Sequence, residues 1–153
     1  MSRKTLLALT ALLAMLLSTT MLAGAAPLDT TDQVGGRPLT AALTGATAGV
    51  SGSATVTVNV GQGTVCYELT VNGLPNSAVG TVTASHIHKG AAGTNGGIVV
   101  PFTQIPTNGS SSGCTTGLSK ELLKDIIQNP DQYYVNVHSS LQPAGFIRGQ
   151  LSK

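Results

Sequence analysis

The chain has 153 residues, which suits one domain, and only 3% are aromatic, so its core must be built from Val, Leu, Ile and Ala. Eight Lys and Arg face six Asp and Glu, but Arg3 and Lys4 lie in a leader that we expect to be removed. Six charges of each sign then remain, which gives no support for a basic nucleic-acid-binding surface. We therefore expect no nucleic-acid partner.

Residues 1–25 are predicted to be a signal peptide. Arg3 and Lys4 form its basic start, Leu6–Leu17 is its apolar run, and Ala23–Ala25 offers small residues for cleavage. The rival interpretation is a retained transmembrane anchor, but the apolar run is short for the roughly 20 residues that span a bilayer. A lipid anchor would need a cysteine near the cleavage point, where there is none. We expect a secreted protein without a membrane span after cleavage, extracellular or, in a host with an outer membrane, periplasmic.

The predicted domain spans residues 39–153, and its first half is predicted to consist of strands. Residues 26–38 form a polar, flexible lead-in, and Leu39–Leu43 is the first strand. The clearest hairpin follows, with strands at Ser53–Val60 and Thr64–Val71 joined by a tight glycine turn. The apolar side chains that alternate toward one face of this hairpin are Val56, Val58, Val60, Val65, Tyr67, Leu69 and Val71.

Two further strands are predicted around a glycine-rich loop. The first covers Val79–His88, the loop covers Lys89–Gly97, and Ile98–Phe102 is the second strand. Because a strand rather than a helix follows the loop, we do not interpret it as a phosphate site. Gln104–Gly113 is predicted to be another loop. Unless a bulge intervenes, the side chains sharing one face of the first strand are Val82, Ala84, His86 and His88.

One helix is predicted at Leu118–Gln128, with Ser119 as its N-cap and Pro130 after its end. Its apolar stripe consists of Leu122, Leu123, Ile126 and Ile127. Its solvent-facing side consists of Lys120, Glu121, Lys124 and Asp125.

Tyr133–Leu151 contains the last two strands, joined by a loop at Ser139–Gly145. In the first of them Tyr133, Val135 and Val137 alternate with Tyr134, Asn136 and His138. Short strands, glycine-rich turns and one helix predict an all-β fold, an antiparallel β-sandwich with one short helix.

Cys66 and Cys114 are the only cysteines, and in an exported chain they are expected to form a disulfide bond. The bond would join the second strand of the hairpin to the segment before the helix. We interpret its role as structural.

Three histidines form the candidate site. His86 and His88 are two residues apart on a strand, so both imidazoles project from one face, and His138 lies on another strand, away from its apolar face. Three converging imidazoles would bind Cu or Zn. The alternative, which we favour at this point, is that they hydrogen-bond loop backbones and restrain the loops at Lys89–Gly97 and Ser139–Gly145.

Four segments in order resemble the CHRD domain, named from chordin and found in exported bacterial proteins: Ala84–Gly90, Gly93–Gly96, Tyr133–His138 and Gly145–Leu151. The resemblance covers about residues 39–151. It implies an immunoglobulin-like or superoxide-dismutase-like β-sandwich and no established catalytic activity. The link to chordin suggests an extracellular protein or cell-surface ligand as the partner.

The His-x-His strand with a distant third histidine is also similar to the copper site of Cu/Zn superoxide dismutases. No further histidine is present to bridge two metals, so a mononuclear site is the most that the chain could make. Arg148 would either guide an anion to such a site or pair with Glu68, and we favour the pair.

No catalytic residue is predicted, because no Gly-x-Ser-x-Gly motif occurs and the aspartates fall in the lead-in, the helix or loops. The leading hypothesis is therefore a secreted, non-enzymatic CHRD-type structural or interaction module without a cofactor. The alternative is a Cu- or Zn-binding protein, including a redox enzyme similar to superoxide dismutase, that uses His86, His88 and His138.

Overall fold

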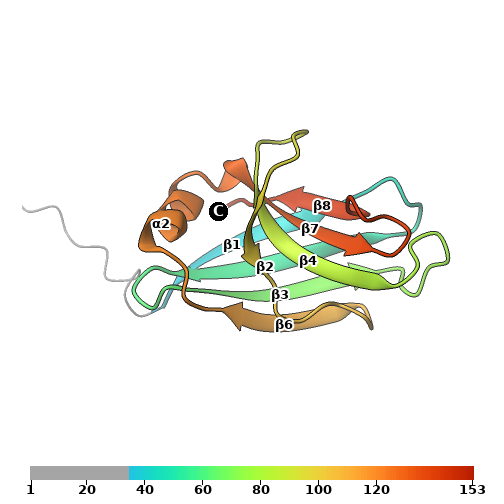
Figure 1. Cartoon of the computed structure of the whole chain (residues 1–153), viewed down its shortest axis with the longest axis horizontal. Helices are drawn as coiled ribbons and strands as arrows, with labels where there is room; N and C mark the ends of the chain where they lie inside the picture. Colours follow the sequence, from blue (N-terminus) through green and yellow to red (C-terminus); the bar gives the residue numbers. More distant parts are fainter. Residues whose placement is uncertain (1–34) are drawn as a thin grey trace, which may run out of the picture.

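The computed structural model describes residues 35–153, which form two antiparallel β-sheets packed face to face (Figure 1). The strand order is β1-β2-β3-β6 in the first sheet and β5-β4-β7-β8 in the second. The elements are β1 Arg37–Leu43, β2 Ser51–Asn59, β3 Thr64–Asn72, β4 Val82–Lys89, β5 Ile98–Pro101, β6 Ser110–Thr115, α2 Lys120–Gln128, the 3-10 turn η1 Pro130–Gln132, β7 Tyr133–Ser139 and β8 Ile147–Gln150. The predicted all-β antiparallel sandwich with one short helix is confirmed.

The predicted signal peptide and its cleavage point lie outside the described residues. Within residues 35–153, no helix is long and apolar enough to cross a membrane. The first strand begins two residues earlier than predicted. Arg37 and Pro38, assigned to the lead-in from sequence, are part of β1 because Arg37 still pairs with Val58 in the ladder to β2.

The hairpin of β2 and β3 supplies the centre of the core. Val56, Val58 and Val65 are fully buried, and Tyr67 lies with its ring stacked on that of Phe102 at a centroid distance of 3.8 Å. The alternating pattern predicted for both strands is therefore confirmed. Burial of each such aliphatic side chain contributes about 1.5–3 kcal/mol, so this hairpin is a main source of stability.

The edges of the two sheets meet where β1 lies beside β8. Thr44 and Arg148 exchange backbone hydrogen bonds of 3.0 and 2.9 Å, and Thr40 pairs in the same way with Ser152. Gly149 makes this approach possible, since a Cβ there would lie 2.0 Å from the carbonyl oxygen of Ala42. The seam fixes β8, and with it Arg148, relative to the first sheet.

Two predicted elements differ from the structure. The strand predicted from Val79 begins only at Val82, because the backbone N–H groups of Val79 and Gly80 turn back to the carbonyl of Asn76. The predicted loop Gln104–Gly113 contains the start of β6, which has no apolar alternation. Its inward position at Gly113 must be small, because a Cβ there would lie 2.7 Å from the Tyr67 hydroxyl.

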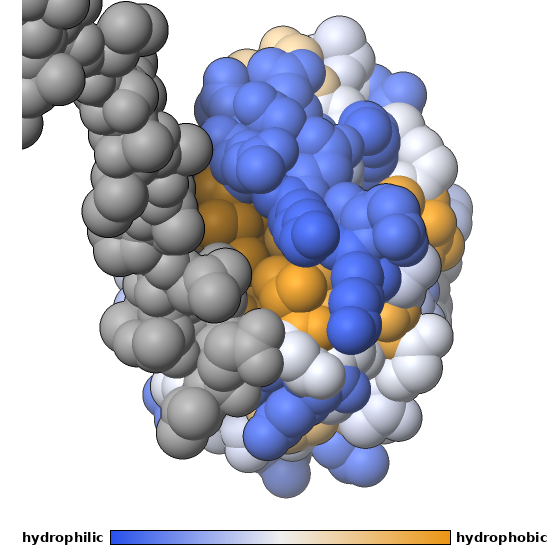
Figure 2. All heavy atoms as spheres, turned by 90° about the vertical axis from the view of Figure 1, so that its left-hand side faces the viewer, coloured by the Kyte–Doolittle hydropathy of each residue, from blue (hydrophilic) through white to orange (hydrophobic). Residues whose placement is uncertain are grey.

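The helix α2 has the predicted N-cap and the predicted end but begins at Lys120, two residues later than predicted. Ser119 accepts a hydrogen bond from the N–H of Leu122 at 3.2 Å, and Leu123 and Ile126 are fully buried. Figure 2 views the end of the sandwich that carries α2, where hydrophilic side chains lie over an apolar interior that shows between them. The helix thus closes one end of the core.

Asp125 was predicted to lie on the solvent-facing side of this helix, and its carboxylate accepts hydrogen bonds from three side chains. It accepts hydrogen bonds from the Lys89 ammonium at 2.7 Å, the Tyr133 hydroxyl at 2.5 Å and the Asn129 amide at 2.7 Å. These donors, Lys89 first, hold the pKa of Asp125 well below its usual range. Asp125 therefore ties the helix to the end of β4 and the start of β7.

Candidate functional site

The register of β4 and β7 places the three histidines on the outer face of the second sheet. His86 lies opposite Asn136, and His138 lies opposite Ala84, so His138 is a diagonal neighbour of His86. Diagonal neighbours on a sheet are within reach of aromatic side chains. The bulge that the sequence left open lies between Val82 and Ala84 and turns Val82 into the core, whereas Ala84, His86 and His88 share the outer face.

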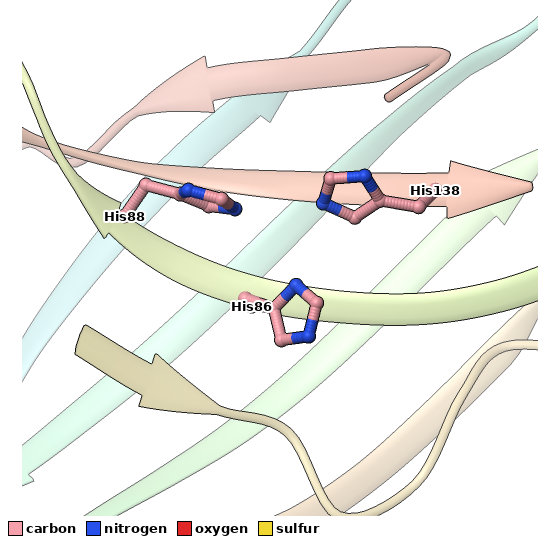
Figure 3. A group of neighbouring side chains, drawn as sticks. All are labelled: His86, His88 and His138. Atoms are coloured by element: carbon pink, nitrogen blue, oxygen red, sulfur yellow. The ribbon is translucent and has the colours of Figure 1, made fainter. Parts of the chain in front are cut away.

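The three imidazole rings form one cluster (Figure 3). The ring centroids are 5.6 Å apart for His86 and His88, 5.1 Å for His86 and His138, and 5.6 Å for His88 and His138. One nitrogen of each ring lies within 4.8 Å of the corresponding nitrogens of the other two. His88 is 7% exposed, and the other two are half-buried. The sequence thus predicted a real convergence of side chains.

Two of these rings hold loops, as the architectural prediction expected. Nδ1 of His88 is 2.9 Å from the carbonyl oxygen of Gly96, and Nδ1 of His138 is 2.9 Å from that of Pro143. A carbonyl only accepts, so Nδ1 carries the proton in each neutral ring and Nε2 carries the lone pair. Both histidines therefore present Nε2 as a potential ligand atom.

The remaining nitrogens of the cluster have no partner. Nδ1 of His86, Nε2 of His88 and Nε2 of His138 are inaccessible to solvent and make no hydrogen bond to any described residue. Buried polar atoms in native proteins nearly always have a partner, which is a protein group, ordered water or an ion. The outer nitrogens explain how the loops are held, but these inner ones remain to be explained.

Burial and mutual repulsion lower the pKa of two of the three histidines. The pKa of His86 is lowered to about 4, first by burial and then by the charges that His138 and His88 would carry. Burial also lowers the pKa of His88, with His138 and Arg148 adding to it, although the Gly96 carbonyl acts in the opposite direction. Both side chains are therefore neutral at pH 7, the state in which imidazole binds metals.

Tyr134 and Arg148 extend the cluster on one side. The Tyr134 ring stacks on His88 at 5.0 Å, and the Arg148 guanidinium lies 4.9 Å from the Tyr134 centroid. Arg148 donates to the Thr94 carbonyl and the Asn95 side chain, both at 3.1 Å. The favoured pairing of Arg148 with Glu68 is wrong, because Glu68 lies on β3 in the other sheet.

The disulfide bond between Cys66 and Cys114 is present and lies on the first sheet. The two residues are directly opposite each other on β3 and β6. The predicted pairing is confirmed, although the segment before the helix is a strand rather than a loop.

A comparison with protein-family models matches the CHRD domain over residues 25–151. The chain belongs to the CHRD family. Neither a search of the curated proteins nor a search of the solved structures finds a match. The CHRD match supports a non-enzymatic module of unknown ligand. Three of the four segments that suggested the family, Ala84–Gly90, Gly93–Gly96 and Tyr133–His138, meet around the histidine cluster.

Sequence reasoning did not identify the groups that orient this CHRD cluster. Gly96 accepts from His88 through its carbonyl and donates through its N–H to the Tyr134 hydroxyl at 3.1 Å. Asn136 donates to the Ala144 carbonyl at 3.1 Å and so supports the second loop. The one available signal was the repeated polar residue on alternate positions of β7, which indicates a face covered by polar structure.

Proposed function

We propose that this CHRD protein is exported and acts outside the cytoplasm as a non-enzymatic structural or interaction module. The CHRD match over most of the chain carries the proposal, because this domain is not a known enzyme family and occurs outside cells. The Cys66–Cys114 bond supports it, since disulfides persist in oxidising compartments and are rare in the cytosol.

The chemistry of the described residues fits a module without a reaction of its own. The histidine cluster contains no carboxylate or thiol among residues 35–153, so no nucleophile, base and orienting acid stand together there. All three histidines of the chain belong to the cluster, so none is left to bridge a second metal. We therefore do not propose a redox enzyme similar to superoxide dismutase.

The contact surface that best suits a partner lies beside the cluster. A groove of about 330 Å³ lies between the turn after β1 and the loop before β8, and its lining mixes apolar residues such as Phe146 and Ile147 with the polar side chains of Asn95, Asn136, Gln142 and Arg148. Small-molecule sites are mostly apolar, whereas amides and a guanidinium suit the polar rim of a protein interface. We propose an extracellular protein or cell-surface ligand with carboxylate or carbonyl groups as the occupant.

Export is tested by the mass of the protein secreted from its natural host or a related one. The expected product lacks about 25 residues and reacts with no alkylating agent until it is reduced. A product that retains Arg3 and Lys4, or that labels at both cysteines without reductant, contradicts the proposal.

The contact surface is tested by photo-cross-linking on living cells. A photoreactive residue replaces Asn95 at the groove, and a matched control replaces Thr55, which is exposed on the outer face of the first sheet. The expected result is an adduct with a secreted or surface component at Asn95 but not at Thr55. Equal adducts at both positions, or none at Asn95, contradict the proposed surface.

A further inference from the structure

We propose that His86, His88 and His138 form a mononuclear site for a transition-metal ion of the copper and zinc class, bound through Nδ1 of His86 and Nε2 of His88 and His138. This inference goes beyond the proposed module function and does not depend on it. It starts from the three nitrogens that are buried, lack partners and face one another (Figure 3).

The spacing of these nitrogens fits one ion after a small adjustment. In a tetrahedral site with metal–nitrogen bonds of about 2.0–2.1 Å, ligand nitrogens lie about 3.3 Å apart. The three ligand atoms already lie within 4.8 Å of one another. Their separations must shrink by no more than about 1.5 Å to reach that geometry, which rotation of the rings about their side-chain bonds supplies.

Loop carbonyls orient two of the ligands in advance. Histidine ligands usually donate their other ring nitrogen to a carbonyl or carboxylate, which fixes the tautomer and the ring. His88 makes this bond to Gly96, and His138 makes it to Pro143. A purely architectural role needs only these outer bonds. It does not account for the free Nε2 atoms, nor for His86, which makes no hydrogen bond to any described residue.

The donor set selects the class of ion. Three neutral imidazoles without a carboxylate in the group suit Cu and Zn and disfavour Mg and Ca, which prefer oxygen ligands. For a nitrogen site, Cu(II) binds more tightly than Zn(II). Three protein ligands leave further coordination positions to solvent or to another ligand.

A substitution at His86 tests metal binding without disturbing the hydrogen bonds that hold the loops. His88 and His138 each hold a loop, so replacing either one disturbs both roles. His86→Gln removes a ligand and leaves every observed loop contact in place. The matched control is Thr55→Ala, because Thr55 is exposed on the outer face of the first sheet and belongs to neither loop that lies over the histidines.

The experiment uses the mature protein without a His tag, stripped with chelator and titrated calorimetrically with CuCl₂, ZnCl₂ or MgCl₂. Wild type and Thr55→Ala are expected to bind one Cu(II) or one Zn(II) per chain, copper more tightly, and no Mg(II). His86→Gln is expected to lose more than about 100-fold in affinity, since even outer-shell changes cost 10–100-fold. Gly96→Ala, whose Cβ would lie 1.5 Å from the Lys89 carbonyl oxygen, should lose about 10–100-fold.

The proposal is overturned if the wild type binds neither copper nor zinc. It is also overturned if His86→Gln binds metal as tightly as wild type, because the ion then lies elsewhere, such as at the terminal amine. If His86→Gln does not fold, electron paramagnetic resonance of Cu(II)-loaded wild type decides. Coupling to three imidazole nitrogens is the expected spectrum, and a spectrum without imidazole coupling overturns the proposal.

Discussion

The outer faces of the two sheets differ in whether the side chains that point outward are exposed to solvent or covered by loops. On the first sheet, outward side chains such as Thr55, Glu68 and Thr70 lie exposed around the disulfide between β3 and β6. On the second sheet they include the large polar rings of the histidines and Tyr134, and the loops at 90–97 and 140–146 lie over these rings. A polar residue at an outward position is thus not always a solvated one.

The outer faces of the two sheets are also stabilised by different kinds of interaction. The first is fastened by a covalent bond between neighbouring strands. The second depends on hydrogen bonds that His88, His138 and Arg148 donate to loop carbonyls and on one that the Tyr134 hydroxyl accepts from the Gly96 N–H. Substitutions on the first face, except at the cysteines, should therefore have small effects, while those on the second should affect both stability and metal binding.

The largest effect is expected from removing the disulfide. Cys66→Ala with Cys114→Ala opens a link between residues separated by 48 positions, which in the chain-entropy model costs about 4 kcal/mol of unfolding free energy. Urea unfolding of the double variant and wild type measures the loss. A loss below about 1 kcal/mol would show that the cross-link contributes little beyond the existing strand pairing.

Next in size is the loss of a loop-holding ring on the second sheet. His88→Ala leaves the Gly96 carbonyl without its donor and removes the stack on Tyr134, so a loss of about 1–3 kcal/mol is expected in chelator. His86→Gln, which breaks no observed hydrogen bond, should cost less than about 1 kcal/mol in chelator. Equal losses for both variants, measured by urea unfolding, would contradict the assignment of separate roles.

A smaller change is expected from acid. The pKa of His86 is lowered from 6.5 to about 4 in the folded protein, so between these values the unfolded chain binds protons more readily. The contribution of His86 to stability is therefore complete above pH 6.5 and is lost as the pH falls toward 4. Asp125, whose pKa is lowered from 3.8, acts in the same direction at lower pH. Urea midpoints in chelator should fall from pH 7 to 4 less steeply for His86→Gln than for wild type, and identical slopes would contradict this assignment.

The smallest effect is expected on the exposed face of the first sheet. Thr55→Ala removes an exposed side chain for which no hydrogen bond is observed, so its unfolding free energy should stay within about 0.5 kcal/mol of wild type, with metal affinity unchanged. Calorimetry and urea unfolding of this variant provide the baseline for the other predictions. A larger loss of unfolding free energy would contradict the expectation that substitutions on this face have small effects.

The sequence predicted those elements whose residues carry their own periodicity. Val56, Val58 and Val65 mark the core hairpin, and Ser119 with Leu123 and Ile126 marks the helix. The strand β6 could not be found this way, because Ser110–Gly113 offers no apolar alternation and its fit depends on the ring of Tyr67. The pattern of β4 was likewise offset by the bulge before Ala84, which only the pairing with β7 reveals.

The three histidines of the candidate site and the two loops that they hold were predictable, but the particular carbonyls that accept from the rings were not. The spacing of His86 and His88 puts both rings on one face, and the polar side of β7 adds His138. The carbonyls of Gly96 and Pro143 belong to loops whose course depends on glycines and on long-range contacts. For the same reason the partner of Arg148 was assigned wrongly, since charge alone indicated Glu68 whereas the fold brings the loop residues Thr94 and Asn95 to it.

The most direct test of the central claim, that loop carbonyls orient a preformed set of metal ligands, is the tautomer of each histidine in the metal-free protein. Long-range proton–nitrogen correlation spectra in chelator at pH 7.5 assign the protonated nitrogen of each ring. The account predicts Nδ1–H for His88 and His138, with both Nε2 atoms unprotonated, and one equivalent of Zn(II) should then shift those Nε2 atoms and Nδ1 of His86. Nε2–H on His88 and His138, or three rings whose nitrogens do not respond to zinc, would contradict it.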